Sequence, residues 1–150
     1  MSKKKAPARP AAPVVDSVTV SLELPVPQRR VFEVVSDANQ LPGWAGPIKS
    51  VRADGPKPTV DYELPGGRVS CVYGADLDAA RGTADWTVHF PDAPPLRVYT
   101  RAMPIDDRRS IFTLTLVSPP LGPARAKNAK ALMEKNLAQD LERLKTLIGA

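Results

Sequence analysis

The sequence has 150 residues, of which 43% are hydrophobic and 25% are charged, a composition typical of one globular domain. Its single cysteine excludes an internal disulfide framework, and no apolar run is long enough to form a transmembrane helix. The 21 basic and 16 acidic residues give a formal net charge of +5, and the 17 prolines predict short, closely spaced elements.

The positive charge is concentrated in the N-terminal tail. Residues 1–15 are rich in alanine and proline, and their only charged residues are Lys3, Lys4, Lys5 and Arg9. We therefore predict a disordered tail at residues 1–15 and a folded domain at residues 16–150. A solubilising extension is the simpler interpretation of the tail, and a weak contact with an acidic surface is the alternative. The tail has no aromatic residue, which argues against specific nucleic-acid recognition, and no signal-peptide core, so we expect a cytoplasmic protein.

The first predicted elements are a strand and two short helices. Residues 17–24 alternate between apolar and polar side chains, which predicts a half-buried strand. The prolines in residues 25–27 end this strand and can begin a helix. That helix has an apolar side made of Val31, Phe32, Val34 and Val35. Asp37 can cap a second helical turn, which we expect to end before Pro42, leaving Trp44 in a turn-rich stretch.

Six further strands are predicted, separated by turns rich in glycine, proline and aspartate. Their expected ranges are 48–53, 59–64, 68–75, 83–90, 96–103 and 111–117. Pro65-Gly66-Gly67 joins two strands and opens no helix, so it predicts a hairpin turn rather than a phosphate loop. Residues 76–82 are predicted to form a loop.

The strand at residues 96–103 has two faces of different character. One face contains Leu96, Val98, Thr100 and Ala102, and the other contains Arg97, Tyr99, Arg101 and Met103. Burial of unpaired guanidinium groups is costly, so we expect the first face to point inward. If the second face pointed inward, its two arginines would suit an anionic or polyketide-like ligand.

The last predicted element is a long helix from Pro123 to Ile148, about 39 Å in length at 1.5 Å per residue. Its apolar residues recur at spacings of three and four and form one stripe. The stripe consists of Ala126, Ala129, Met133, Leu137, Leu141, Leu144 and Ile148, and Leu132 and Leu147 are expected to widen it. Gly149 suits the end of the helix. The predicted fold is α+β, with a curved seven-stranded antiparallel sheet wrapped around this helix.

Two stretches resemble a known superfamily. Residues 18–44 read VTVSLELPVPQRRVFEVVSDANQLPGW, and residues 139–148 read QDLERLKTLI. With the order of elements over residues 17–149, they resemble the START-like, birch-allergen-like helix-grip superfamily (SRPBCC), in its polyketide cyclase/dehydrase-like branch. The resemblance implies a helix-grip fold that holds an apolar ligand in a cavity between the sheet and the long helix. It is more specific for fold than for activity, because members include lipid carriers, hormone receptors and cyclases.

Catalytic and metal-binding constellations are mostly excluded by counting. One histidine and one cysteine cannot form a zinc site of the His/Cys type, and phosphate-binding, dinucleotide-binding and nucleophile-elbow motifs are missing. We therefore predict no metal and no cofactor. His89 has the outward parity of its strand and is expected on the surface, whereas Cys71 is expected to be a buried apolar residue. Turn and capping roles are favoured for the Asp106-Asp107 pair over glycosidase-type chemistry.

The candidate ligand-binding residues are those that the predicted strands and helix point inward. They are Tyr62, Cys71, Tyr73, Trp86, Val88, Phe112, Leu114, Met133 and Leu137. Aromatic residues make up only 5% of the chain, so small side chains opposite the helix are expected to leave volume for an apolar ligand. The first hypothesis for function is therefore binding or transport of an apolar small molecule or lipid without covalent chemistry.

Two other functions stay open. A cyclase or aromatase-type enzyme would use Tyr62, Tyr73 or Arg101 as acid and orienting groups, and it requires a polar cluster that points inward. A non-catalytic interaction domain with a filled core would act through the basic tail or through the basic patch in the first turns of the long helix, at Arg125, Lys127 and Lys130.

Overall fold

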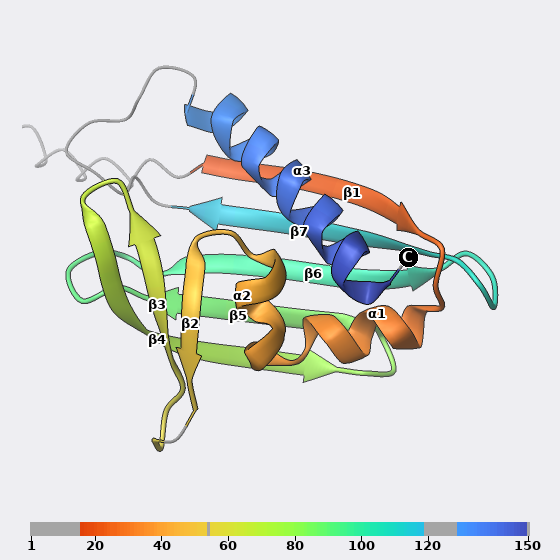
Figure 1. The fold of residues 1–150 in the computed structure, drawn as a ribbon, viewed down its shortest axis with the longest axis horizontal. Coiled ribbons are helices and arrows are strands. Elements are labelled where there is room, and N and C mark those ends of the chain that lie inside the picture. The colour runs from red at the N-terminus through yellow and green to blue at the C-terminus, as the bar shows by residue number, and fades with distance from the viewer. Residues whose placement is uncertain (1–15, 54, 119–128, 150) are drawn as a thin grey trace, which may run out of the picture.

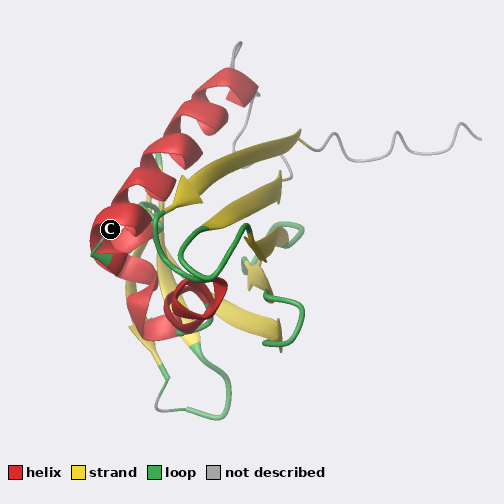
Figure 2. Ribbon diagram, turned by 90° about the vertical axis from the view of Figure 1, so that its right-hand side faces the viewer, coloured by secondary structure: helices red, strands yellow, loops and turns green. Residues whose placement is uncertain are grey.

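The computed structural model describes residues 16–53, 55–118 and 129–149. The predicted tail at residues 1–15 and the predicted start of the last helix, with Ala126, lie outside these residues. Within them, one curved sheet carries helices on one face (Figure 1), and Figure 2 shows the helices gathered on one side of the sheet. No helix of the described residues is long and apolar enough to span a membrane.

The elements follow the predicted order. They are β1 (Asp16–Leu24), α1 (Gln28–Val35), the 3₁₀ turn η1 (Ala38–Gln40), α2 (Leu41–Trp44), β2 (Ile48–Arg52), β3 (Thr59–Leu64), β4 (Gly67–Asp78), β5 (Thr83–His89), β6 (Leu96–Pro104), β7 (Ser110–Ser118) and α3 (Ala129–Ile148). All seven strands form a single antiparallel sheet in the order β1-β7-β6-β5-β4-β3-β2. The predicted α+β architecture, a seven-stranded antiparallel sheet with a long C-terminal helix, is confirmed.

The alternating patterns place the core on the concave face. On β6 the side chains of Leu96, Val98 and Ala102 are buried. Thr100 is also buried, and its hydroxyl donates a hydrogen bond to the Ala84 carbonyl oxygen at 2.6 Å. Arg97, Tyr99 and Arg101 are exposed on the convex face. The predicted inward face of this strand is confirmed, and neither arginine lies on the concave face.

Two boundaries differ from the prediction. The helical turn does not end before Pro42, because proline is tolerated in the first turn of a helix; α2 continues to Trp44, which is buried. The predicted loop at residues 76–82 is also too long, because β4 continues to Asp78 by pairing with Thr83 of β5. The turn that remains is closed by Gly82, whose φ of +70° is a left-handed conformation that favours glycine.

The C-terminal helix divides into two unlike halves. The buried residues of α3 are confined to its second half and are Asp140, Leu141, Leu144 and Ile148. Met133 and Leu137 on the same stripe are half-buried. Leu132 is 57% exposed, so the prediction that it widens the apolar stripe is wrong, whereas Leu147 is 37% exposed and lies against Gly43 of α2. Each of them directly precedes a stripe residue, and one residue is about 100° of rotation around a helix. Gly149, at a φ of +85°, ends the helix as predicted.

Candidate functional site

The concave face of the sheet brings together the predicted ligand-binding residues that lie on strands. All of these are buried in one hydrophobic core: Tyr62, Cys71, Tyr73, Trp86, Val88, Phe112 and Leu114. From α3, Leu137 packs against this core, whereas Met133 is half-buried and does not belong to it. The alternation therefore predicted which strand residues are buried, and the residues expected from α3 are less buried than those on the sheet.

Trp44 of α2 lies at the centre of the aromatic part of this face. Its ring meets Trp86 edge-on at a centroid distance of 6.4 Å and Phe112 edge-on at 6.0 Å. Trp86 also packs against Tyr73, with their centroids 6.0 Å apart. Such edge-to-face pairs stabilise an aromatic cluster beyond the burial of its area. Trp44 is absent from the predicted site, although its Pro-x-Trp context was a signal that could have included it.

Two polar groups in this cluster are unpaired. The indole nitrogens of Trp44 and Trp86 are both buried, and neither has a hydrogen-bond partner among the described residues. Buried donors without partners are rare in folded proteins, and each such donor requires a physical reason. The hydroxyls of Tyr62 and Tyr73 also make no hydrogen bond with the described residues. The inner face therefore presents four hydrogen-bond donors within an otherwise apolar surface.

Both tyrosine hydroxyls keep their protons at neutral pH. Burial raises the pKa of Tyr73 to about 12. Burial, and then the nearby Asp140 carboxylate, raise the pKa of Tyr62 further above its usual range. Burial also raises the pKa of the Cys71 thiol, and the nearby Asp61 carboxylate adds to this. The expected character of Cys71 as a buried, unreactive side chain is therefore consistent with its surroundings.

Asp140 is a buried carboxyl group that the sequence interpretation missed. It is 5% exposed, and its Oδ1 accepts hydrogen bonds from the Gly46 N–H at 3.2 Å and from Arg143 Nη1 at 2.7 Å. Burial raises its pKa to about 6, although these two donors and Lys49 act in the opposite direction. A search for apolar residues alone passes over Asp140, yet its spacing from Leu137 and Leu144 places it on the apolar stripe.

The contact with Asp140 and Arg143 accounts for a glycine at position 46. A Cβ atom at Gly46 would lie 2.6 Å from Arg143 Nη1 and 3.0 Å from Asp140 Oδ1. A side chain there would displace the Arg143 guanidinium and crowd the Asp140 carboxylate. The contact joins the segment after α2 to the second half of α3, which is the anchored half.

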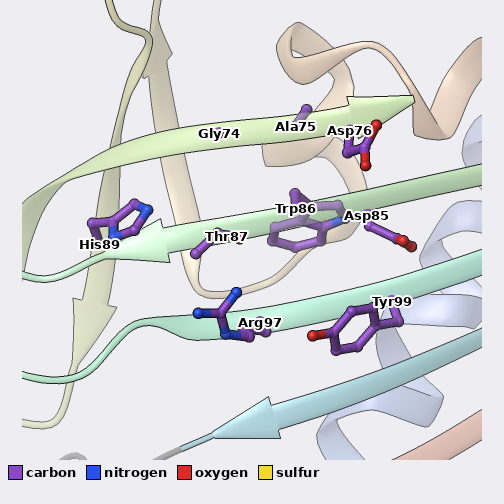
Figure 3. Close-up of a pocket in the computed structure, with 9 residues that line it drawn as sticks. All are labelled: Gly74, Ala75, Asp76, Asp85, Trp86, Thr87, His89, Arg97 and Tyr99. Carbon is purple, nitrogen blue, oxygen red and sulfur yellow. The ribbon is translucent and has the colours of Figure 1, made fainter.

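A pocket of about 330 Å³ lies on the convex face of the sheet, over β4, β5 and β6 (Figure 3). Gly74 lies on the β4 side of the pocket, Thr87 and His89 project from β5, and Arg97 and Tyr99 project from β6. Two aspartates lie at the end opposite His89. The exposed position predicted for His89 is confirmed. Within the described residues, no group of three or more His, Cys, Asp or Glu side chains is placed to hold a metal ion.

Comparison with known proteins identifies the fold and the family. The family profile described as "Polyketide cyclase / dehydrase and lipid transport" matches residues 16–149. None of the curated proteins matches the chain in sequence. Among solved structures, a START superfamily protein from Mycobacterium smegmatis is 14% identical with a TM-score of 0.73, covering 89% of this chain and 97% of that chain.

Two further structures have the same architecture. The Zhui aromatase/cyclase from Streptomyces sp. R1128 is 18% identical with a TM-score of 0.72, covering 91% of this chain and 94% of that one. Ara h 8.0201 is 17% identical with a TM-score of 0.64, covering 90% and 98%. Identities this low establish the fold alone, whereas the profile spans nearly the whole chain. The chain thus belongs to the family described as polyketide cyclase/dehydrase and lipid transport.

Proposed function

We propose that the chain binds an apolar small molecule or lipid that carries an oxygen acceptor, between the concave face of the sheet and α3. The predicted ligand-binding residues on the sheet, with Trp44, would contact the ligand from one side. Met133 and Leu137 of α3 would contact it from the other. The family description, which includes lipid transport, supports this class of ligand.

The observation that carries the proposal is the pair of unpaired indole donors. A buried donor without a partner costs about 1–3 kcal/mol. A ligand whose carbonyl or hydroxyl oxygen lies between Trp44 and Trp86 would remove this cost. Because the buried residues of α3 are confined to its second half, its first half is the part of the helix that can shift to admit such a ligand.

Matched ligands with and without an acceptor test the proposal. We expect 2-acetonaphthone to bind more tightly than 2-ethylnaphthalene, which has a similar shape but no carbonyl oxygen. Trp44→Phe and Trp86→Phe each remove one indole N–H. In each variant, the ratio of the affinity for 2-acetonaphthone to that for 2-ethylnaphthalene should fall by roughly two- to tenfold. Isothermal titration calorimetry measures both affinities, and thermal denaturation verifies that each variant is folded.

Leu77→Ala is the control variant, because Leu77 is 48% exposed and makes no part of the proposed site. It should leave both affinities unchanged. Failure of 2-acetonaphthone to bind the wild-type protein would contradict the proposal. Equal affinities for the two compounds would remove the role assigned to the indole groups.

A cyclase-type enzyme is the second candidate, and the buried Asp140 carboxyl beside Tyr62 favours it. A carboxyl group with a pKa of about 6 can exchange protons near neutral pH, and a protonated tyrosine can donate one. Arg101, the third group considered for this chemistry, is on the convex face and cannot serve there. We expect an active cyclase to convert a synthetic linear poly-β-ketone thioester with loss of water, detected by mass spectrometry. Asp140→Asn should then abolish turnover, and lack of turnover in the wild-type protein would exclude this function for that substrate.

A further inference from the structure

Gly74 lies in the interior of β4, where neither a bulge, a positive φ nor crowding requires a glycine. The pairing of β4 with β5 is continuous on both sides of it, from Val72↔His89 to Asp78↔Thr83, so there is no bulge. Its φ is not among the positive values that favour glycine, and a Cβ atom added to it would have no described atom within 4 Å. A glycine inside a strand weakens the strand, and it is found at bulges, at bends and where a ligand or another backbone approaches closely. The open pocket above Gly74 is such a site.

The side chains nearest to this opening carry hydrogen-bond donors. Gly74 pairs with Thr87 across the sheet, and Thr87 pairs with Arg97, so the three form one row. In Figure 3 the Tyr99 hydroxyl points along β6 toward Arg97, whose guanidinium reaches toward Thr87. Arg97 makes no ion pair or hydrogen bond with any residue in the described part of the chain. A free guanidinium among hydroxyl donors is suited to a carboxylate or phosphate group.

The opposite end of the pocket is acidic and limits the kind of anion. Asp85 and Asp76 lie roughly 7 Å along the strands from the row of Gly74, at 3.4 Å per residue. Asp85 Oδ1 already accepts the Thr100 N–H at 3.1 Å, which fixes its position. Two carboxylates at this end repel an extended polyanion such as a nucleic acid. They favour a compact ligand with one anionic group and a hydrogen-bond donor at its other end.

We propose that this convex-face pocket is a second binding site for a compact organic molecule with one anionic group, which Arg97 holds while the body of the molecule lies over Gly74. Its volume of about 330 Å³ is within the range of small-molecule sites. The site lies on the face of the sheet opposite to the proposed apolar site beneath α3. Failure of one proposal therefore leaves the other standing.

Benzoate and phenyl phosphate are suitable probes, because they share a ring and differ in the anionic group. Benzyl alcohol, which has the ring without the charge, is the control compound. We expect either anion to shift the backbone amide signals of residues around Gly74, Thr87 and Arg97 in ¹⁵N NMR titrations of the full chain, and benzyl alcohol to leave them unchanged. A preference for phenyl phosphate would identify a phosphate site, and a preference for benzoate a carboxylate site.

Three variants distinguish binding in this pocket from nonspecific electrostatic attraction of anions to the surface. Gly74→Val fills the pocket and should weaken binding tenfold or more, while the melting temperature stays the same or rises because valine favours strands. Arg97→Gln should weaken binding by a similar factor. Arg101→Gln removes the next outward arginine of β6, which does not line the pocket, and should leave binding unchanged. Binding that survives Gly74→Val, an equal loss in Arg101→Gln, or no shifts with either anion would overturn the proposal.

Discussion

Replacement of Gly82 by alanine is expected to lower the free energy of unfolding by roughly 3 kcal/mol or more. The residue has a φ of +70°, which is unfavourable for alanine, and the added Cβ would overlap the Ala102 carbonyl oxygen. That oxygen accepts a hydrogen bond from Gln28 Nε2 at 2.7 Å, and the Ala102 N–H donates to the Gly82 carbonyl oxygen at 2.8 Å. The substitution therefore disturbs the contact of α1, the β4–β5 turn and β6 at one point. Urea denaturation followed by circular dichroism measures the change.

Gly67→Ala is the matched control for this experiment. Gly67 also has a positive φ, +130°, but a Cβ atom there would have no described atom within 4 Å. Its substitution tests backbone strain alone and is expected to cost about 1–3 kcal/mol. If Gly82→Ala were no more destabilising than Gly67→Ala, the overlap with Ala102 would have no energetic consequence, and steric crowding would not be the reason for a glycine at position 82.

The second large effect is the pH dependence that Asp140 confers on stability. Its pKa in the folded protein is about 6, above its ordinary value of 3.8, so folding favours the protonated carboxyl. The stabilisation is complete below the ordinary pKa and is lost as the pH rises through about 6. At 1.36 kcal/mol per pKa unit, the loss amounts to about 3 kcal/mol. In Asp140→Asn, whose amide does not titrate, we expect this decline between pH 4 and pH 7 to disappear.

Urea denaturation at intervals across this pH range measures the effect, and Asp106→Asn provides a control of opposite sign. The Arg108 N–H and the Arg109 side chain lower the pKa of Asp106. Its contribution is therefore present above its ordinary pKa and is lost as the pH falls, so this variant loses stability at neutral pH rather than at acid pH. A decline between pH 4 and pH 7 that persists in Asp140→Asn would show that the decline has another origin.

Local sequence patterns predicted most of the fold, because the alternation of side chains in a strand and the stripe of a helix are local properties. β3 and the inward face of β6 follow directly from them. The extension of β4 through Asp76 to Asp78 could not be predicted in this way. Aspartate has a low preference for strands, and pairing with β5 overrides that preference.

The candidate sites were predictable to different degrees. The inward residues of the sheet required only the correct parity, whereas the role of Asp140 depends on its contact with Gly46, which is 94 positions away in the sequence. Prediction of the pocket on the convex face would require the registers of three strands, because Gly74, Thr87 and Arg97 become neighbours only when those strands pair. Alternation indicates only which face of each strand is buried, whereas the register of a hairpin also depends on the length and type of its turn.

Because the buried residues of α3 are confined to its second half, detachment of its first half is a separate event from unfolding of the whole domain. Detachment of its first half breaks few buried contacts, so its free energy is far below that of unfolding the whole domain. A ligand bound beneath it would enter and leave through this local opening while the sheet stays intact. The residence time of such a ligand is then governed by the N-terminal half of one helix, and the thermal stability of the protein is governed elsewhere. Selection can therefore tune ligand exchange and thermal stability independently.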